Sequence, residues 1–169
     1  MRTFLFLIVM GVTALGLKLL GSAGVLLQKE GPQKYPSLEE AKKELKLGGV
    51  QLPAYFPQYL EWPPFEIIAQ EKPFTMILMH FRERGTKNTV LSIQQMDSKF
   101  KETLTSRIEP DQIAKKGNIL IKERPIVFFH SFCRDGLPCN KVVWEEGGHR
   151  FSLVAKDSVE ELLKIAGSM

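Results

Sequence analysis

The stretch Ile126-Val-Phe-Phe-His-Ser-Phe132 carries the strongest strand signal in the chain, and the residues around it set the fold class. Five of its seven residues are β-branched or aromatic side chains, which favour strands. Residues 141–145 and 150–154 are the next strand segments, and Gly147-Gly148 makes the turn between them. Because hairpins join consecutive strands, we expect an antiparallel sheet in this part of the chain.

Further strand segments precede this stretch. The predicted strands are 65–69, 75–83, 89–95 and 118–122, with a turn at residues 85–88. Residues 97–116 are charged and weakly periodic, so we expect a helix or a loop there.

Two helices flank the strands. Ser37 with Glu40, and Ser158 with Glu161, have the spacing of capping boxes that begin helices. The order helix, hairpin-linked strands, helix does not alternate strand and helix, which argues against a parallel sheet. We therefore predict an α+β fold: an antiparallel sheet of about six to seven strands with an N-terminal and a C-terminal helix packed on one face.

The first 27 residues are apolar and are set apart from the domain. Two interpretations remain open. Small residues at 21–23 fit a cleaved signal peptide, whereas the length of the apolar run fits an uncleaved membrane anchor that tolerates Lys18. Arg2 favours a cytoplasmic N-terminus. Residues 28–36 are expected to form a linker and residues 37–169 a single domain in the cell envelope, on the outer face of the cytoplasmic membrane, in the periplasm or outside the cell.

Composition limits the classes of partner. Hydrophobic residues make up 44% of the chain and charged residues 25%, which is the balance of a folded globular protein. The formal net charge is +4, of which Arg2 and Lys18 account for two charges. The remainder is too weak and too mixed in sign to predict a nucleic-acid partner.

The two cysteines, Cys133 and Cys139, flank the turn signal Asp135-Gly136 at the tip of a predicted hairpin. Opposed strand residues near a turn lie at disulfide distance, and an exported domain lives where the bond persists. We expect this disulfide. The alternative is a zinc site that adds His130 and His149, but their spacing matches no common ligand pattern, so no metal is predicted.

No catalytic motif is visible. The chain has no nucleophile elbow, zinc-protease helix, phosphate loop or dinucleotide fingerprint. His80 and His130 lie inside apolar strands and are expected to be satisfied sheet residues, whereas His149 is expected to be solvated at its glycine turn. We predict no catalytic residue and no cofactor. An enzyme stays open only because sites assembled in space leave no local signal.

A stretch rich in aromatics and prolines precedes the first strand of the sheet. Its aromatic rings are the best candidates for a binding surface, because tyrosine and tryptophan suit interfaces. The alternative is that the rings cover the core. The candidates are Tyr55, Phe56, Tyr59, Trp62 and Phe65.

Several segments together resemble a known family. They are Leu52-Pro-Ala-Tyr-Phe-Pro57, Val143-Trp-Glu-Glu-Gly-Gly148 and Ser158-Val-Glu-Glu-Leu-Leu163. They are similar to a domain of unknown function in bacterial exported and membrane-anchored proteins. That family occurs beside anti-sigma-factor-like membrane proteins and is distantly similar to outer-membrane lipoprotein carriers and periplasmic envelope-stress regulators. The resemblance covers residues 37–169 and brings no catalytic residues with it.

Two functions follow as expectations. The first is an extracytoplasmic, membrane-associated binding or regulatory module whose partner is another envelope protein. The alternative is a carrier of a lipid or other apolar ligand. The carrier requires a cavity, which we expect to be lined by Phe74, Met76, Leu78, Phe128 and Phe132.

Overall fold

The computed structural model describes residues 31–45, 47, 49–100 and 107–169. Within these residues the chain forms eight strands and two helices. In chain order the elements are β1 (Gln33–Tyr35), α2 (Leu38–Leu45), β2 (Glu66–Gln70), β3 (Met76–Arg82), β4 (Thr89–Asp97), β5 (Pro110–Ile121), β6 (Arg124–Cys133), β7 (Asn140–Glu146), β8 (His149–Ala155) and α3 (Val159–Gly167).

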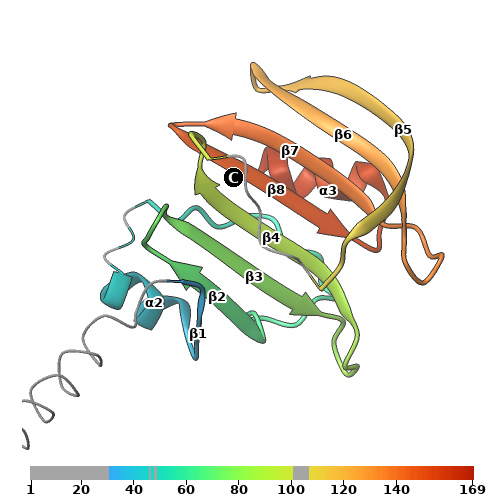
Figure 1. Ribbon diagram of the computed structural model, residues 1–169. Coiled ribbons are helices and arrows are strands. Elements are labelled where there is room, and N and C mark those ends of the chain that lie inside the picture. The colour runs from blue at the N-terminus through green and yellow to red at the C-terminus, as the bar shows by residue number, and fades with distance from the viewer. Residues whose placement is uncertain (1–30, 46, 48, 101–106) are drawn as a thin grey trace, which may run out of the picture. The chain divides into compact units, whose positions relative to one another are not determined.

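All of these strands lie in one sheet, in the order β1-β2-β3-β4-β8-β7-β6-β5 (Figure 1). Every neighbouring pair is antiparallel. The predicted α+β class and antiparallel sheet are confirmed, but the sheet has eight strands rather than six to seven. The chain passes from β4 to the far edge at β5 and returns through three hairpin-linked strands, so that β8 pairs with β4.

The extra strand comes from the predicted linker. In β1, Lys34 pairs with Ile68 and Tyr35 pairs with Ile67 of β2. Tyr35 is buried on the core side of the sheet. This burial and the pairing with β2 hold the segment as a strand, although its sequence has no strand periodicity. The expectation that residues 28–36 are only a linker is wrong for Gln33–Tyr35.

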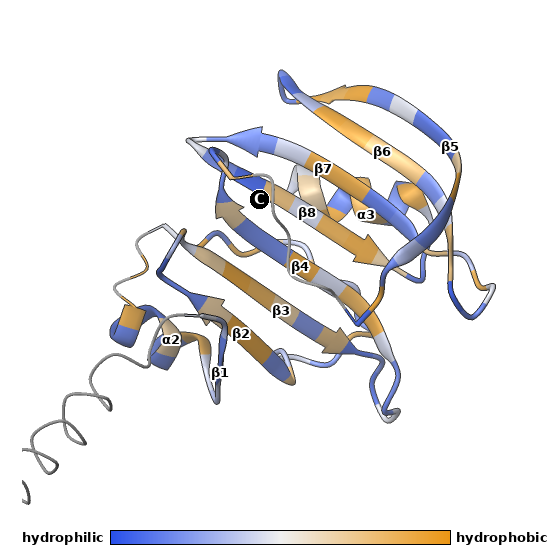
Figure 2. Ribbon diagram, viewed as in Figure 1, coloured by the Kyte–Doolittle hydropathy of each residue, from blue (hydrophilic) through white to orange (hydrophobic). Residues whose placement is uncertain are grey.

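β5 begins at Pro110, eight residues before the strand predicted at residue 118. Nearly all of its side chains are exposed, because it is an edge strand that pairs with β6 alone. An exposed edge strand needs no hydrophobic periodicity, so the sequence pattern gave no strand signal for its first half. The expectation of a helix or loop is wrong for this half. Figure 2 shows the contrast between the largely hydrophilic β5 and the largely hydrophobic β3.

The two faces of the sheet differ, as strand alternation requires. On β4, Leu91 and Ile93 are buried in the main hydrophobic core. Ser92, Gln94 and Met96 alternate with them and belong to the opposite face. This second face positions the candidate site.

Both helices contribute to the main core. α2 supplies Leu38 and Ala41 and packs on β1 and β2, whereas α3 packs on β6, β7 and β8. The side chains of Ser37 and Ser158 accept hydrogen bonds from the backbone N–H of Glu40 and Glu161, each at 3.1 Å. The structure thus shows the serine half of each predicted capping box.

The proline-rich segment between α2 and β2 also covers the core. Leu60 is 2% exposed, and Leu52 and Phe56 pack against the core cluster. The Ala54 N–H donates a hydrogen bond to the Ser168 carbonyl at 3.3 Å, which ties the segment to the end of α3.

Among the described residues, no helix has the length and apolar character needed to cross a bilayer. The segment 1–27, predicted as signal peptide or anchor, lies outside the described residues. The described domain forms one compact unit, Pro32–Met169.

Candidate functional site

A cavity of about 520 Å³ lies on the second face of the sheet. Drug-sized ligands occupy pockets of about 300–1,000 Å³, so its volume suits a small organic molecule or an acyl chain. Its apolar lining comes from β4, β6, β7 and the start of β5: Met96, Pro110, Ile113, Val127, Phe129 and Val143.

Curvature of the sheet forms this cavity. β4 and β5 are separated by three strands in the sheet order. In a flat sheet the four inter-strand steps from β4 to β5 would put them roughly 19 Å apart, at about 4.8 Å per step. Yet Gln94 of β4 and Lys116 of β5 line the same cavity, so the sheet bends toward this face. β5 and the residues just before it therefore form one wall, facing β4 and β8.

Polar side chains are set among the apolar ones. They are Gln94, Ser131 and Ser152, together with Glu109, Lys116, Lys141 and Arg150. Ser131 is 3% exposed, and its Oγ has no hydrogen-bond partner among the described residues. Buried polar atoms are almost always hydrogen-bonded, so this hydroxyl indicates a missing partner.

The charges around the cavity are unequal in sign. Arg150 donates hydrogen bonds to Glu145 through Nε at 3.0 Å and Nη2 at 2.7 Å. Glu109 lies 3.8 Å from the Arg134 guanidinium. Lys141 has no ion pair within the described part of the chain, and burial lowers the pKa of its ammonium, against the opposing charge of Glu109. Cationic side chains therefore outnumber the carboxylates that neutralise them.

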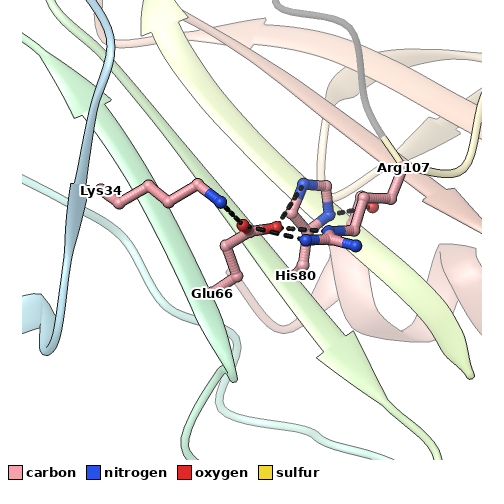
Figure 3. Close-up of polar contacts among 5 residues, drawn as sticks. Lys34, Glu66, His80 and Arg107 are labelled. Atoms are coloured by element: carbon pink, nitrogen blue, oxygen red, sulfur yellow. Dashed lines mark hydrogen bonds and ion pairs between the residues drawn. The ribbon is translucent and has the colours of Figure 1, made fainter. Parts of the chain in front are cut away.

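A second polar cluster lies on the same face, nearer β2 (Figure 3). The Glu66 carboxylate pairs with Lys34 Nζ at 2.7 Å and accepts a hydrogen bond from Arg107 Nη2 at 3.0 Å. Hydrogen bonding from Arg107 is the main reason that the pKa of Glu66 falls to about 2. His80 Nδ1 shares a hydrogen bond with Ser92 Oγ at 2.8 Å, and its Nε2 lies 3.9 Å from Glu66 Oε2.

This cluster contains serine, histidine and glutamate, the residue types of a hydrolase triad, but its geometry is structural. Ser92 is 2% exposed and His80 is 1% exposed, so a substrate has no path to the hydroxyl. Glu66 is held by two cations and is too far from His80 for a hydrogen bond. Burial lowers the pKa of His80 to about 4, which keeps its ring neutral. Through these contacts the cluster holds β1, β2, β3 and Arg107 together.

The sequence profile of the domain of unknown function DUF4367 matches residues 53–169. The chain belongs to the DUF4367 family. No curated protein and no solved structure matches the chain significantly. The family match begins later than the predicted start at residue 37, so β1 and α2 precede it. The expected links to anti-sigma-factor-like proteins and to lipoprotein carriers stay predictions.

In the DUF4367 domain, the five residues predicted as an aromatic binding surface do not all lie together. Tyr55, Tyr59 and Trp62 are 40%, 41% and 53% exposed, and the Phe56 ring lies 5.5 Å from that of Trp62. Phe65 lies elsewhere. Its ring contacts the cluster on the cavity face of the sheet, 6.3 Å from the ring of His80. The surface stays a prediction for the first four residues, and Phe65 does not join them.

Two of these tyrosines are tied to α3. The Tyr55 hydroxyl donates to the Glu161 carboxylate, and the Tyr59 hydroxyl donates to Asp157. The hydrogen bond to Glu161 raises the pKa of Tyr55, and burial with the Asp157 bond raises that of Tyr59. Their hydroxyls therefore serve the fold, and the exposed indole of Trp62 stacks on the buried Phe81 ring at 6.0 Å.

The cysteines of the DUF4367 domain lie at disulfide distance, with the Cα atoms of Cys133 and Cys139 5.1 Å apart. The zinc alternative has no support among the described residues, where no three potential ligands gather. His130 packs edge-on against Phe128 at 5.6 Å, and His149 against Phe151 at 6.3 Å.

The predicted lining of a ligand cavity is wrong, because none of its five residues lines the observed cavity. Phe74 and Met76 form a separate buried cluster with Met96. Phe128 packs toward the main core, and Phe132 is 43% exposed. The prediction placed Phe128 and Phe132 on the wrong face of β6. Met76 and Leu78 do share the cavity's face, but they lie on β3, which does not line the cavity.

Sequence reasoning missed every lining residue, including the polar residues Ser131, Lys116, Lys141 and Arg150. A signal was present in the alternation of β6, where Phe129 and Ser131 share a face. That alternation does not say which strands face each other across a cavity, so it did not suffice.

Proposed function

We propose that this DUF4367 protein is a non-catalytic binding module of the cell envelope and that the cavity on the second face of the sheet holds its apolar ligand. The observation that carries the proposal is the closure of one cavity of about 520 Å³ by side chains of β4 and β5, which are not neighbours in the sheet. Curved sheets that enclose apolar cavities are well suited to hold small ligands.

Two features support a place in the envelope. The cysteine pair lies at disulfide distance, and such bonds persist in oxidising compartments. The apolar segment 1–27 fits export or anchoring. A ligand carried by such a module would come from the membrane or from the surrounding envelope.

The test uses the full chain in a non-ionic amphipol and N-phenyl-1-naphthylamine, a neutral apolar dye that fluoresces when it leaves water. We expect saturable binding by the wild type. Val143→Phe places a larger ring in the cavity and should weaken dye binding about ten-fold. Ile119→Phe is the matched control, because Ile119 is an exposed residue of β5 outside the cavity.

Circular dichroism of each variant confirms that the fold is kept. If wild type and Val143→Phe give the same titration curve, or if the wild type does not saturate, the cavity is not a ligand site and the proposal is wrong.

A further inference from the structure

The cavity wall holds a row of two lysines and one aromatic ring. Phe129 of β6 pairs with Lys116 of β5 on one side and with Lys141 of β7 on the other. All three side chains line the cavity, and Lys116 Nζ lies 5.7 Å from the centre of the Phe129 ring. Since neighbouring strands are about 4.8 Å apart, the lysine backbones stand roughly 10 Å apart with the ring between them.

The two lysines lack a close counter-charge within the described residues, although the charge of Glu109, which also lines the cavity, acts on Lys141. In the part of the chain that the structure describes, neither Lys116 nor Lys141 has a carboxylate within ion-pair distance, whereas Arg150 is engaged by Glu145. Lys141 is partly buried, and a partly buried cation without a close counter-charge is unfavourable, whereas Lys116 is exposed. An anionic group bound between the two ammoniums would remove this cost.

Ser131 adds an uncharged donor beside the same row. The Cys139 N–H donates to the Ser131 carbonyl at 2.9 Å, which places Ser131 opposite Cys139 and diagonal to Lys141. Its side chain lines the cavity, and its buried Oγ lacks a partner within the described residues. The two ammoniums are the donors that suit the oxygens of a carboxylate or phosphate, and the Ser131 hydroxyl joins them only where rotation about χ1 turns its buried Oγ toward the cavity.

The neighbouring row of the wall starts with an apolar pair and continues into Ser152 and Gln94. Val127 pairs with Val143, and Met96 lines the cavity farther along. The donors and the apolar surface therefore lie side by side in one cavity, as an amphipathic ligand requires.

We propose that the cavity selects a single-chain anionic amphiphile, with its carboxylate or phosphate monoester between Lys116 and Lys141 and its chain on Val127, Val143 and Met96. This inference rests on the proposed function of the cavity and adds the chemical class of the ligand. Free fatty acids and phosphorylated single-chain lipids share this chemistry.

The test is competition against N-phenyl-1-naphthylamine on the full chain in non-ionic amphipol. The four competitors share one chain length and differ in head group: octanoate, octyl phosphate, octanol and octylammonium. We expect both anions to displace the dye at concentrations about ten-fold lower than octanol, and octylammonium to be weakest. The ratio of octanoate to octyl phosphate then identifies which anion the site prefers.

Lys141→Met keeps the length of the side chain and removes its charge, so we expect it to bring octanoate down to the affinity of octanol. Ser131→Ala should likewise weaken the binding of both anions. Lys115→Met is the matched control, because Lys115 is exposed on β5 next to Lys116 and is not part of the cavity lining.

The outcomes separate the two proposals. If octanol competes as well as octanoate, or if Lys141→Met leaves the preference for anions intact, the head-group inference is wrong while the cavity remains a ligand site. If no competitor displaces a dye that binds saturably and is weakened by Val143→Phe, the head-group inference is wrong; if the dye does not bind in this way, the proposed function itself fails.

Discussion

His80 illustrates how tertiary structure decides the charge of a side chain. It lies on β3 and is 1% exposed, and its ring bonds to Ser92. Burial lowers its pKa from 6.5 to about 4; the Glu66 charge opposes this shift, and the charges of Arg107 and Lys34 add to it. A histidine with this surrounding is neutral through the physiological range, which makes it a packing residue rather than a proton donor.

This pKa predicts a dependence of stability on pH. Between pH 6.5 and about 4 the unfolded chain binds a proton at His80 that the folded chain does not, so acid favours unfolding. We expect the wild type to lose on the order of 3 kcal/mol from this group across that window. Urea unfolding at a series of pH values measures it, and His80→Gln should flatten this part of the curve.

Glu66 acts in a lower window. Its pKa falls from 4.5 to about 2, so its contribution is complete above pH 4.5 and is lost as the pH falls toward 2. In the histidine experiment the control is His149→Gln, because His149 is only partly buried, at the start of β8. An equal loss of stability in wild type and His80→Gln between pH 6.5 and 4 would contradict the assignment.

At the scale of elements, the contact between β5 and β6 depends on one missing side chain. A Cβ added at Gly117 would lie 2.2 Å from Cζ of the Phe128 ring and within 2.9 Å of two further ring carbons. Gly117 and Phe128 face each other in the register of the two strands. The glycine lets the ring lie across the edge strand, and β5 in turn supplies one wall of the cavity.

We therefore predict that Gly117→Ala destabilises the domain by about 1–3 kcal/mol, the usual cost of overpacking. Phe128→Leu in the same chain should recover part of the loss, because it removes the ring that clashes. Asn118→Ala, at the next and exposed position, is the control and should change stability little. The midpoints of urea unfolding are compared for wild type, Gly117→Ala, the double variant and Asn118→Ala. Equal midpoints for wild type and Gly117→Ala would show that the strand shifts freely.

At the scale of the whole molecule, the described domain contains its own core. β1 and α2 contribute Tyr35, Leu38 and Ala41 to the main hydrophobic cluster, although they precede the family match at residue 53. The structural unit starts at Pro32. The boundary of the folding unit is therefore set by packing and lies upstream of the boundary of family similarity.

From this we predict that a fragment 32–169 unfolds cooperatively and binds N-phenyl-1-naphthylamine as the full chain does. A fragment 53–169 should lose the cooperative transition, because it lacks four buried core residues, Leu47 included, and the strand that covers one edge of β2. Thermal unfolding followed by circular dichroism compares the two. A fragment 53–169 as stable as 32–169 would show that β1 and α2 are dispensable.

The sequence by itself determined the local elements. Alternating or β-rich segments predicted β2, β3, β4, β6, β7 and β8, and the serine caps predicted the starts of both helices. These features depend on contacts between residues a few positions apart, which the sequence states directly.

Only the tertiary structure decided which strands became neighbours. The pairing of β4 with β8 joins segments that lie far apart in the chain, and the bend that brings β5 opposite β4 creates the cavity. Alternation tells which residues share a face of one strand, but it is the same for any order of strands in the sheet. Lys116, Lys141 and Ser131 became a candidate site only when that order was fixed, because pairing across strands sets the distances between them.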